Sequence, residues 1–220
     1  MMSEFLKVFV NGLPLLLGGL KFTMELASIS IIIGLFIGLF IAVERVYGGK
    51  FAYVLSTAYV EVIRGTPLLV QLFILYFSLP QIGIHLSPLL ASMISFSLNS
   101  GAYQAEYIRG ALQAVEKGQM KAALSLGMSK RQAIRMIVMP QALRKVLPSW
   151  TNEFVYLIKY TSLAYLVGVP ELTAQGEFYA SRNFQFMNVF LSVAVIYLAV
   201  IFTVTWLLSI LEKKVKVPGV

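Results

Sequence analysis

The residues best placed to do chemistry in this 220-residue sequence are four ionisable side chains inside long apolar stretches: Glu61, Arg64, Glu153 and Lys159. A charged side chain within a bilayer is costly, so it faces the interior of a helix bundle or water rather than lipid. A carboxylate there can bind an ammonium or guanidinium group, and a cation can bind a carboxylate. These residue types therefore indicate either structural ion pairs or a binding site for a small charged solute.

Glu153 and Asn99 are expected at the same depth in the membrane. Counting about 1.5 Å per residue from a helix entry near Leu143 puts Glu153 about 15 Å deep, close to the midplane. The same count from Pro88 puts Asn99 at a similar level, and Tyr103 lies one turn away on the same helix face. We therefore expect Asn99, Tyr103 and Glu153 to converge on one solute. A helix-packing hydrogen bond is an equally weighted alternative for Glu153 and Asn99.

A second polar group, Lys159, Thr161 and Ser162, precedes two helix breakers, Gly168 and Pro170. A helix interrupted there would offer backbone and hydroxyl groups to a carboxylate. Thr161 and Ser162 are therefore further candidate binding residues. Lys159 either assists them or extends its ammonium group toward the membrane surface.

Glu61 and Arg64 are spaced to share one helix face. The helix-breaking sequence Gly65-Thr66-Pro67 follows them directly. We favour a structural Glu61–Arg64 pair that holds a kinked helix over a ligand site.

The elements that must position these residues are predicted to be membrane-spanning helices. The sequence is 58% hydrophobic and only 13% charged, which is typical of a membrane protein. If His85 is neutral, no charged residue occurs between Arg64 and Glu106, and none occurs between Arg182 and Glu212. A spanning helix needs about 20 apolar residues. The pattern predicts an all-α membrane protein with about five transmembrane helices, over residues 19–45, 52–79, 88–115, 143–169 and 186–211.

Positive charge is distributed unevenly between the two sides of this arrangement. One side holds Arg45, Lys50, Arg109, Lys117, Lys121, Lys130, Arg131, Arg135, Arg144, Lys145, Lys213, Lys214 and Lys216. The other side holds Lys7, Lys21 and Arg182. Because cytoplasmic loops are rich in Lys and Arg, we predict an outside N-terminus and a cytoplasmic C-terminus.

The composition argues against several functions. With no Cys, no Asp and one His, the sequence predicts no catalytic residue and no metal site. Asn99-Ser100-Gly101 resembles a protease nucleophile turn only superficially, because no base accompanies it. The only Gly-Lys dipeptide, Gly49-Lys50, lacks the context of a phosphate-binding loop, so we expect no ATP site. The net charge of +8 has no soluble basic domain to carry it, so nucleic-acid binding is not expected.

The polar stretch at residues 116–139 is predicted to be a cytoplasmic helix, turn and helix. Gly127 would end the first helix, and Ser129 would cap the second. A short exposed helix is not stable alone, so its apolar residues require a partner protein with a groove or, alternatively, the lipid surface. The residues expected to meet that partner are Gln119, Lys121, Ala122, Ala123, Leu126, Gly127 and Met128.

This stretch resembles the EAA loop of ABC importer permeases, a pattern of Glu-Ala-Ala followed at fixed spacings by Gly, Ile and Leu-Pro. Ala122, Ala123, Gly127, Ile137 and Pro140 are in register with it. Three further stretches are similar to the polar amino-acid permeases of the histidine, arginine and glutamine type, so the resemblance spans nearly the whole chain. These stretches are Arg64 to Gln71, Ala102 to Gly110 with Tyr103, Glu106 and Arg109, and Lys159 to Leu163.

The resemblance implies a type I ABC importer permease, with a single transmembrane domain over residues 1–220 and an EAA coupling loop at 116–139. Such a protein lies in a prokaryotic cell membrane, the inner one where there are two. It pairs with a second copy or a paralogue, two cytoplasmic ATP-binding subunits and an extracellular or periplasmic substrate-binding protein. ATP and Mg would be bound by the ATPase, and the chain itself would need no cofactor.

The resemblance also implies a polar amino acid as substrate, imported by ATP-driven alternating access. Glu153 favours arginine, lysine or histidine, because its carboxylate would complement a cationic side chain or the α-ammonium, and glutamine is possible. Two departures from the EAA pattern are Lys121 at the acidic position and Met139 before the proline. Lys121 would pair with a carboxylate of the ATPase and restrict which ATPase fits.

Two other classes of protein remain open from the sequence. An ion-coupled carrier or channel would explain the intramembrane charges but not the apolar docking helix. A non-transporting membrane scaffold would tolerate apolar residues at Glu153 and Asn99.

Overall fold

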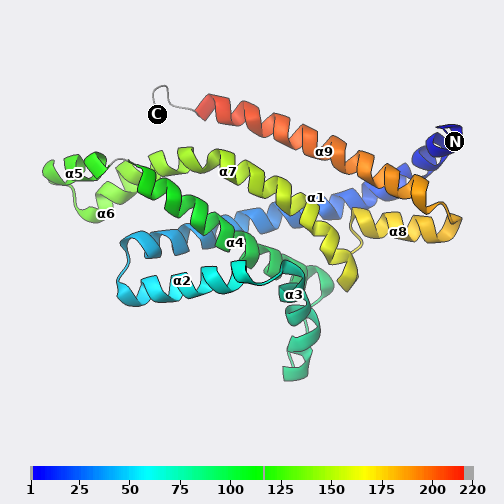
Figure 1. Ribbon diagram of the computed structural model, residues 1–220, viewed down its shortest axis with the longest axis horizontal. Helices are drawn as coiled ribbons and strands as arrows, with labels where there is room; N and C mark the ends of the chain where they lie inside the picture. The colour runs from blue at the N-terminus through cyan, green and yellow to red at the C-terminus, as the bar shows by residue number, and fades with distance from the viewer. Residues whose placement is uncertain (1, 116, 216–220) are drawn as a thin grey trace.

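The computed structural model describes residues 2–115 and 117–215, and these residues are nearly all helical (Figure 1). Glu116 of the predicted loop and Lys216 of the predicted cytoplasmic cations lie outside the described residues. The α-helices are α1 (Met2–Tyr47), α2 (Lys50–Gly65), α3 (Leu68–Phe73), α4 (Pro88–Ala114), α5 (Lys117–Ser125), α6 (Lys130–Ala133), α7 (Met139–Tyr160), α8 (Leu172–Asn183) and α9 (Phe186–Val215). Two π-helical turns, Ile74–Ser78 and Ile134–Val138, and two 3₁₀ segments, Leu79–Ile82 and Thr161–Val167, complete them.

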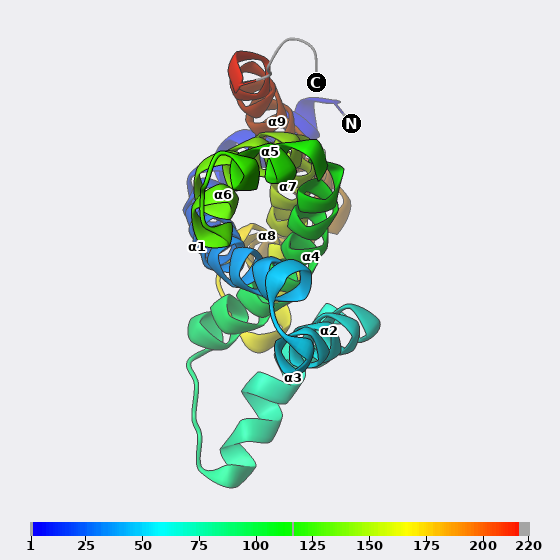
Figure 2. The same ribbon diagram turned by 90° about the vertical axis from the view of Figure 1, so that its left-hand side faces the viewer.

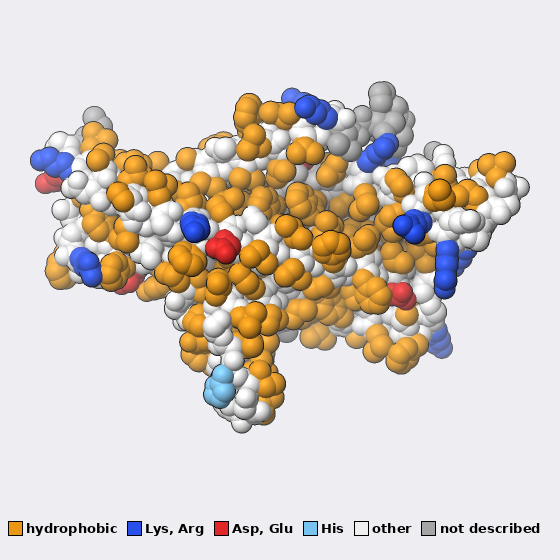
Figure 3. All heavy atoms as spheres, turned by 180° about the vertical axis from the view of Figure 1, so that it is seen from behind, with side chains coloured by type: hydrophobic (Ala, Val, Ile, Leu, Met, Phe, Trp, Pro, Cys, Tyr) orange, Lys and Arg blue, Asp and Glu red, His pale blue; other side chains and the backbone are white. Residues whose placement is uncertain are grey.

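Two described helices are long and apolar enough to cross a membrane by themselves, over Ser3–Tyr47 and Phe186–Lys214. At 46 residues, α1 begins well before the predicted 19–45 span. About 20 residues suffice to cross a membrane, so α1 is longer than one crossing requires. Helices α4 and α7 have 27 and 22 residues, close to the predicted spans. Their polar side chains lower their hydropathy, and many of those side chains are buried within the bundle. On the face shown in Figure 3, the middle of the surface is mostly hydrophobic, and Lys and Arg lie mostly toward its ends.

The predicted helix over 52–79 is broken at the predicted kink, because the chain bends by 102° between α2 and α3, as in a broken span or a re-entrant loop. Thr66 adopts an extended conformation, φ −116° and ψ 142°, as the steric demands of the following Pro67 favour. The amide of Gln71 donates to the carbonyls of Ile63 and Thr66 at 2.7 and 3.0 Å, which satisfies groups that the bend releases. The arm of Leu68–Ile82 therefore projects from the bundle (Figures 1 and 2), with His85 near its tip (Figure 3).

Helices α1 and α4 form the most extensive helix pair, and glycines allow their close approach. A Cβ at Gly38 would lie 2.9 Å from the backbone nitrogen of Ala105 and 3.0 Å from the carbonyl oxygen of Gly101. A Cβ at Gly34 would lie 3.1 Å from the backbone nitrogen of Gly101. The small-residue spacing of Gly34 and Gly38 thus serves helix packing inside the chain.

At the opposite end from α5, a buried carboxylate joins three helices. Glu171 directly precedes α8, and its side chain is fully buried. It accepts hydrogen bonds from the hydroxyls of Thr23 in α1 and Tyr197 in α9, and from the backbone N–H of Thr173 and Ala174 at the start of α8. Burial raises the pKa of the Glu171 carboxyl, although these donors oppose the shift. Its role is to cap α8 and hold it on α1 and α9.

We expect Gly38→Ala to lower the free energy of unfolding by about 1–3 kcal/mol, because the added methyl group meets backbone atoms of α4 that cannot move aside. Gly18→Ala is the matched control on the same helix, since no atom lies within 4 Å of its added Cβ. It should leave stability unchanged or raise it slightly through helix propensity. Unfolding of both variants in detergent measures this, and equal stability of the two would contradict the close α1–α4 contact.

Candidate functional site

Glu153 is a buried carboxylate on α7, only 6% exposed, as expected for an ionisable residue within the bundle. The hydroxyl of Tyr107 on α4 donates to Glu153 Oε2 at 3.3 Å. All ion pairs among the described residues involve Glu106 instead, so no protein cation within salt-bridge distance neutralises Glu153. An ionised carboxylate has about four acceptor positions. Glu153 therefore keeps capacity to accept donors from a cationic group.

Asn99 is also buried, but its amide donates to Gln71 Oε1 on α3 at 3.1 Å. This contact ties α4 to the base of the projecting arm. Within the described residues no hydrogen bond joins Asn99 to Glu153, and the two side chains have different partners. For Asn99 the structure displays the helix-packing alternative, and its contact with a solute stays a prediction.

Tyr103 and Arg64 form a contact that the sequence did not predict. The Arg64 guanidinium lies 5.0 Å from the Tyr103 ring centroid and 3.9 Å from Glu106 Oε2. Glu61 is exposed and forms no ion pair with Arg64. The predicted Glu61–Arg64 pair is therefore wrong: Arg64 reaches across to a better buried carboxylate on α4, where the attraction is stronger than at an exposed site.

Glu106 is the centre of a charge cluster where α1, α2 and α4 meet. Arg45 from α1 forms a hydrogen-bonded ion pair with it, and Arg109 donates to both of its oxygens, at 2.7 Å to Oε2 and 3.3 Å to Oε1. With Arg64 included, three guanidinium groups share one carboxylate. Sequence reasoning missed this cluster and Tyr107, although two spacings pointed to them: Glu106 and Arg109 are three residues apart, and Tyr103 and Tyr107 are four apart.

The candidates at the end of α7 occupy a real helix interruption. The α-helix ends at Tyr160 and continues as a 3₁₀ segment to Gly168, which has φ +95°. However, the hydroxyl of buried Thr161 donates to the Ile158 carbonyl, and that of Ser162 donates to the Lys159 carbonyl. The Lys159 ammonium lies 4.3 Å from the ring centroid of Tyr156. Both hydroxyl groups thus donate to nearby backbone carbonyls, and any ligand role of Lys159, Thr161 and Ser162 stays a prediction.

The predicted partner-binding stretch forms a helix, turn and helix at one end of the molecule (Figure 1). Gly127 has φ +82°, and Ser129 with Gln132 forms a capping box, as the sequence predicted for the turn and cap. Ala122 is exposed and Leu126 is 84% exposed.

The exposure of the other predicted partner-binding residues is mixed. Gln119, Lys121 and Gly127 are exposed, and Met128 is half-buried. Ala123 is 4% exposed, so the expectation that it would face a partner is wrong. It lies on the inner side of α5, toward the remainder of the chain, and Leu124, at 45%, is exposed instead.

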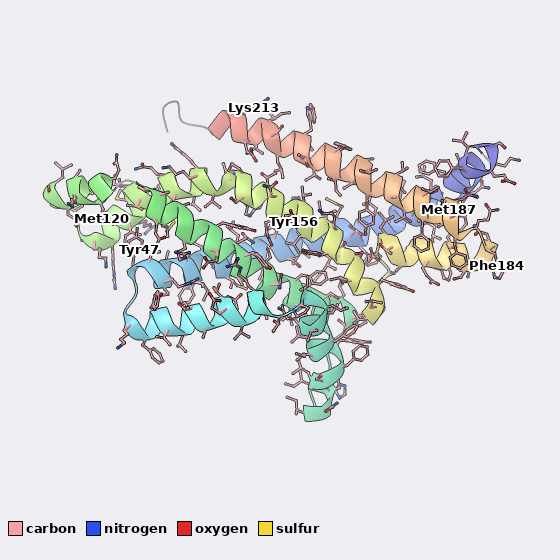
Figure 4. The ribbon with its side chains drawn as sticks, in the orientation of Figure 1. Tyr47, Met120, Tyr156, Phe184, Met187 and Lys213 are labelled. Atoms are coloured by element: carbon pink, nitrogen blue, oxygen red, sulfur yellow. The ribbon has the colours of Figure 1, made fainter. Side chains whose placement is uncertain are left out.

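A recess of about 550 Å³ lies beneath α5. Its lining residues are Val46, Tyr47, Leu112, Gln113, Val115, Met120, Lys121 and Val138. Figure 4 shows Tyr47 and Met120 at this end of the molecule, and Phe184 and Met187 at the opposite end.

Comparison with known proteins shows the same fold and family. A solved structure described as "Crystal structure of an amino acid ABC transporter with histidines" superimposes with a TM-score of 0.87 at 37% identity, covering 93% of this chain and 96% of that one. An inward-facing MetNI methionine ABC transporter matches with a TM-score of 0.75 over 99% of this chain, at 20% identity, which concerns the fold alone. These matches and the helical bundle define a membrane permease with the type I ABC importer fold.

The family described as "Binding-protein-dependent transport system inner membrane component" matches residues 34–217. The glutamine transport system permease protein GlnP of Escherichia coli K12 is 38% identical over 94% of this chain and 95% of its own length. The probable amino-acid ABC transporter permease protein YckA of Bacillus subtilis is 41% identical over 94% and 92%. The chain belongs to this family and is the permease subunit of an amino-acid ABC importer.

Membership of the family decides the division of labour in the transporter. The chain is an inner-membrane component. As a permease subunit it has no ATP site and binds no cofactor itself, so ATP and Mg are used by a separate ATP-binding subunit. A substrate-binding protein is the other partner class that the family implies.

We expect Glu106→Ala to lower the free energy of unfolding by about 3 kcal/mol, because it leaves the guanidinium of Arg45, 8% exposed, without its carboxylate. Glu61→Ala removes an exposed carboxylate from the neighbouring helix and should change stability by less than about 0.5 kcal/mol. Unfolding in mixed detergent and SDS micelles compares them. A larger loss of stability in Glu61→Ala than in Glu106→Ala would support the Glu61–Arg64 pair that the sequence predicted.

Proposed function

We propose that this permease carries a polar amino acid, by preference arginine, lysine or histidine, into the cytoplasm, with glutamine as a further substrate. The supporting observation is Glu153, a buried carboxylate that lacks a cationic partner among the described residues. An idle carboxylate at that depth is costly, so a cationic group of the solute is its natural complement. The crystal structure with histidines and the glutamine permease are consistent with this class of solute.

The proposed path runs along α4 and α7. Tyr103, Tyr107 and Glu153 would contact the solute first, with Asn99 at the arm and Lys159, Thr161 and Ser162 farther along α7. Alternating access would rock these helices between inward-open and outward-open arrangements. Such a motion would change the contact between α4 and α7 at Glu153, where Tyr107 donates a 3.3 Å hydrogen bond.

The ATPase would dock on the residues 116–139 stretch. Ala122, Leu124 and Leu126 offer an exposed apolar surface that suits a groove on a partner. Lys121 is exposed next to them and would select an ATPase with a carboxylate opposite. We propose two such ATPases, two permease copies or a copy with a paralogue, and a substrate-binding protein at the outer side.

The orientation in the membrane follows from the charges. The α1–α2 turn, α5 and α6 lie at one end of the molecule, and α8 and the start of α1 lie at the other (Figure 1). The predicted cytoplasmic cations Arg45, Lys50 and Lys130 belong to the first end. We propose that this end faces the cytoplasm, with the N-terminus outside.

We expect Leu126→Asp to abolish co-purification of the ATPase while leaving the permease folded, because Leu126 is 84% exposed and contributes little to the bundle. Phe184→Asp is the matched control: Phe184 is 83% exposed at the opposite end, and Asp tolerates its positive φ of 56°. Affinity purification of the co-expressed complex measures this. Retention of the ATPase by Leu126→Asp would contradict the coupling surface and would favour an uncoupled carrier.

We expect Glu153→Gln to weaken amino-acid uptake about 10- to 100-fold, because an amide cannot replace a charge-assisted hydrogen bond to the solute. ATPase co-purification should be unchanged, since Glu153 is remote in sequence from α5 and buried in the bundle. Uptake of radiolabelled arginine and glutamine into proteoliposomes containing ATP and the binding protein tests this. Full uptake by Glu153→Gln would mean that the carboxylate only packs helices.

A further inference from the structure

Two tyrosines on one face of α4 each contact a side chain of opposite charge from another helix. Tyr103 carries the guanidinium of Arg64 from α2, 5.0 Å from its ring centroid. Tyr107 donates its hydroxyl to the Glu153 carboxylate from α7 at 3.3 Å. Residues four apart in a helix are about 6 Å apart along one face. A cation and an anion from separate helices therefore contact two tyrosines that are one turn apart on α4, and no salt bridge within 4.0 Å joins Arg64 to Glu153 in the described part of the chain.

Arg64 also retains unused donors. Glu106 is already bonded by Arg45 and Arg109, whereas Arg64 approaches it only to 3.9 Å. The Arg64 side chain is 39% exposed, the most of the three arginines. A guanidinium has five N–H donors, so Arg64 can form a two-pronged contact with a second carboxylate. The three guanidinium groups carry a formal excess of two positive charges over the one carboxylate.

We propose that Arg64 is the receptor for the α-carboxylate of the transported amino acid, while Glu153 receives its α-ammonium group. This inference rests on the proposed function and assigns a binding residue to it. The α-carboxylate and the α-ammonium group of an amino acid are close together. The carboxylate would accept a hydrogen bond from Arg64, and the ammonium group would donate one to Glu153. The solute can thus bridge a gap that the two side chains do not close by themselves.

The arrangement has a consequence for specificity. Recognition of the α-carboxylate by Arg64 and of the α-ammonium group by Glu153 is common to all α-amino acids. A cationic side chain of the solute would be a second donor to the remaining acceptor positions of Glu153. The alternative is that Arg64 only stabilises Glu106. The two roles differ in one respect: a carboxylate receptor distinguishes an amino acid from the same molecule without its carboxylate, and a structural residue does not.

The test measures direct binding to the purified permease–ATPase complex, without the substrate-binding protein, which would impose its own selectivity. Radiolabelled L-arginine is displaced by unlabelled L-arginine or by agmatine, which is arginine without its carboxylate. L-glutamine and 4-aminobutanamide form a second such pair. The wild-type complex should bind the amino acid about 30-fold or more tightly than the amine.

In Arg64→Gln, affinity for the amino acid should fall about 30-fold while that for the amine changes little, so that the ratio approaches one. Arg109→Gln is the matched control, because Arg109 also bonds Glu106 but forms no contact with Tyr103. It should keep the wild-type ratio. Arg64→Lys, which keeps the charge but loses the planar fork, should fall between wild type and Arg64→Gln.

An Arg64→Gln complex with an unchanged ratio of affinities would overturn this inference and assign Arg64 to the support of Glu106. That result leaves the proposed function intact, provided that the wild type binds and Glu153→Gln weakens binding. A wild-type complex that binds neither arginine nor glutamine above background would contradict the proposed function, and this inference with it.

Discussion

Polar side chains on α4 have no water to bind inside a bilayer, and several of them are hydrogen-bonded or ion-paired to neighbouring helices. Gln104 donates to the Ile31 carbonyl of α1 at 3.2 Å, and Asn99 donates to Gln71 of α3. Tyr107 holds Glu153 of α7, and Glu106 collects arginines from α1 and α2. Each neighbour of α4 is thus attached by a specific polar contact. These contacts fix which faces of the helices meet, because apolar packing alone tolerates rotation.

The contacts around α4 differ in kind from one neighbouring helix to the next. The contacts to α1 are close and involve backbone atoms at Gly34 and Gly38, so α1 and α4 form a rigid pair. α7 is joined to α4 by hydrogen bonds from Tyr107 to Glu153 and from Lys145 to the Ala114 carbonyl, and by apolar packing. α2 is joined to α4 by the hydrogen bond from Tyr59 to the Leu98 carbonyl, and Arg64 approaches Glu106 to 3.9 Å. Motion of α2 or α7 against the α1–α4 pair would have to change these contacts. The segment proposed to bind the ATPase leads directly into α7 through the π-helical turn Ile134–Val138, which provides a physical connection.

Much of the fold and part of the site could be predicted from the sequence. The helix bounds of α4 and α9 were close to the prediction, since their lengths and apolar runs are local properties, whereas α7 ends at Tyr160 and continues as a 3₁₀ segment. The turn at Gly127 and the cap at Ser129 were correct for the same reason. The kink at Gly65-Thr66-Pro67 within residues 52–79 was predicted, but its angle of 102° was not, because a sequence break does not give its angle. The fold class and the membrane location also agree with the family.

The sequence by itself determined that the chain is a helical membrane protein with ionisable residues in its apolar stretches and a short polar helix that ends near Gly127, because hydropathy, charge and local spacing set these properties. Only the tertiary structure decided which charges meet. Arg64 pairs with Glu106 on another helix rather than with Glu61 on its own, and Glu171 turns inward to join three helices. The position of Tyr107 beside Glu153 likewise depends on how α4 and α7 are rotated. Contacts between helices distant in sequence follow from packing geometry, which no local pattern contains.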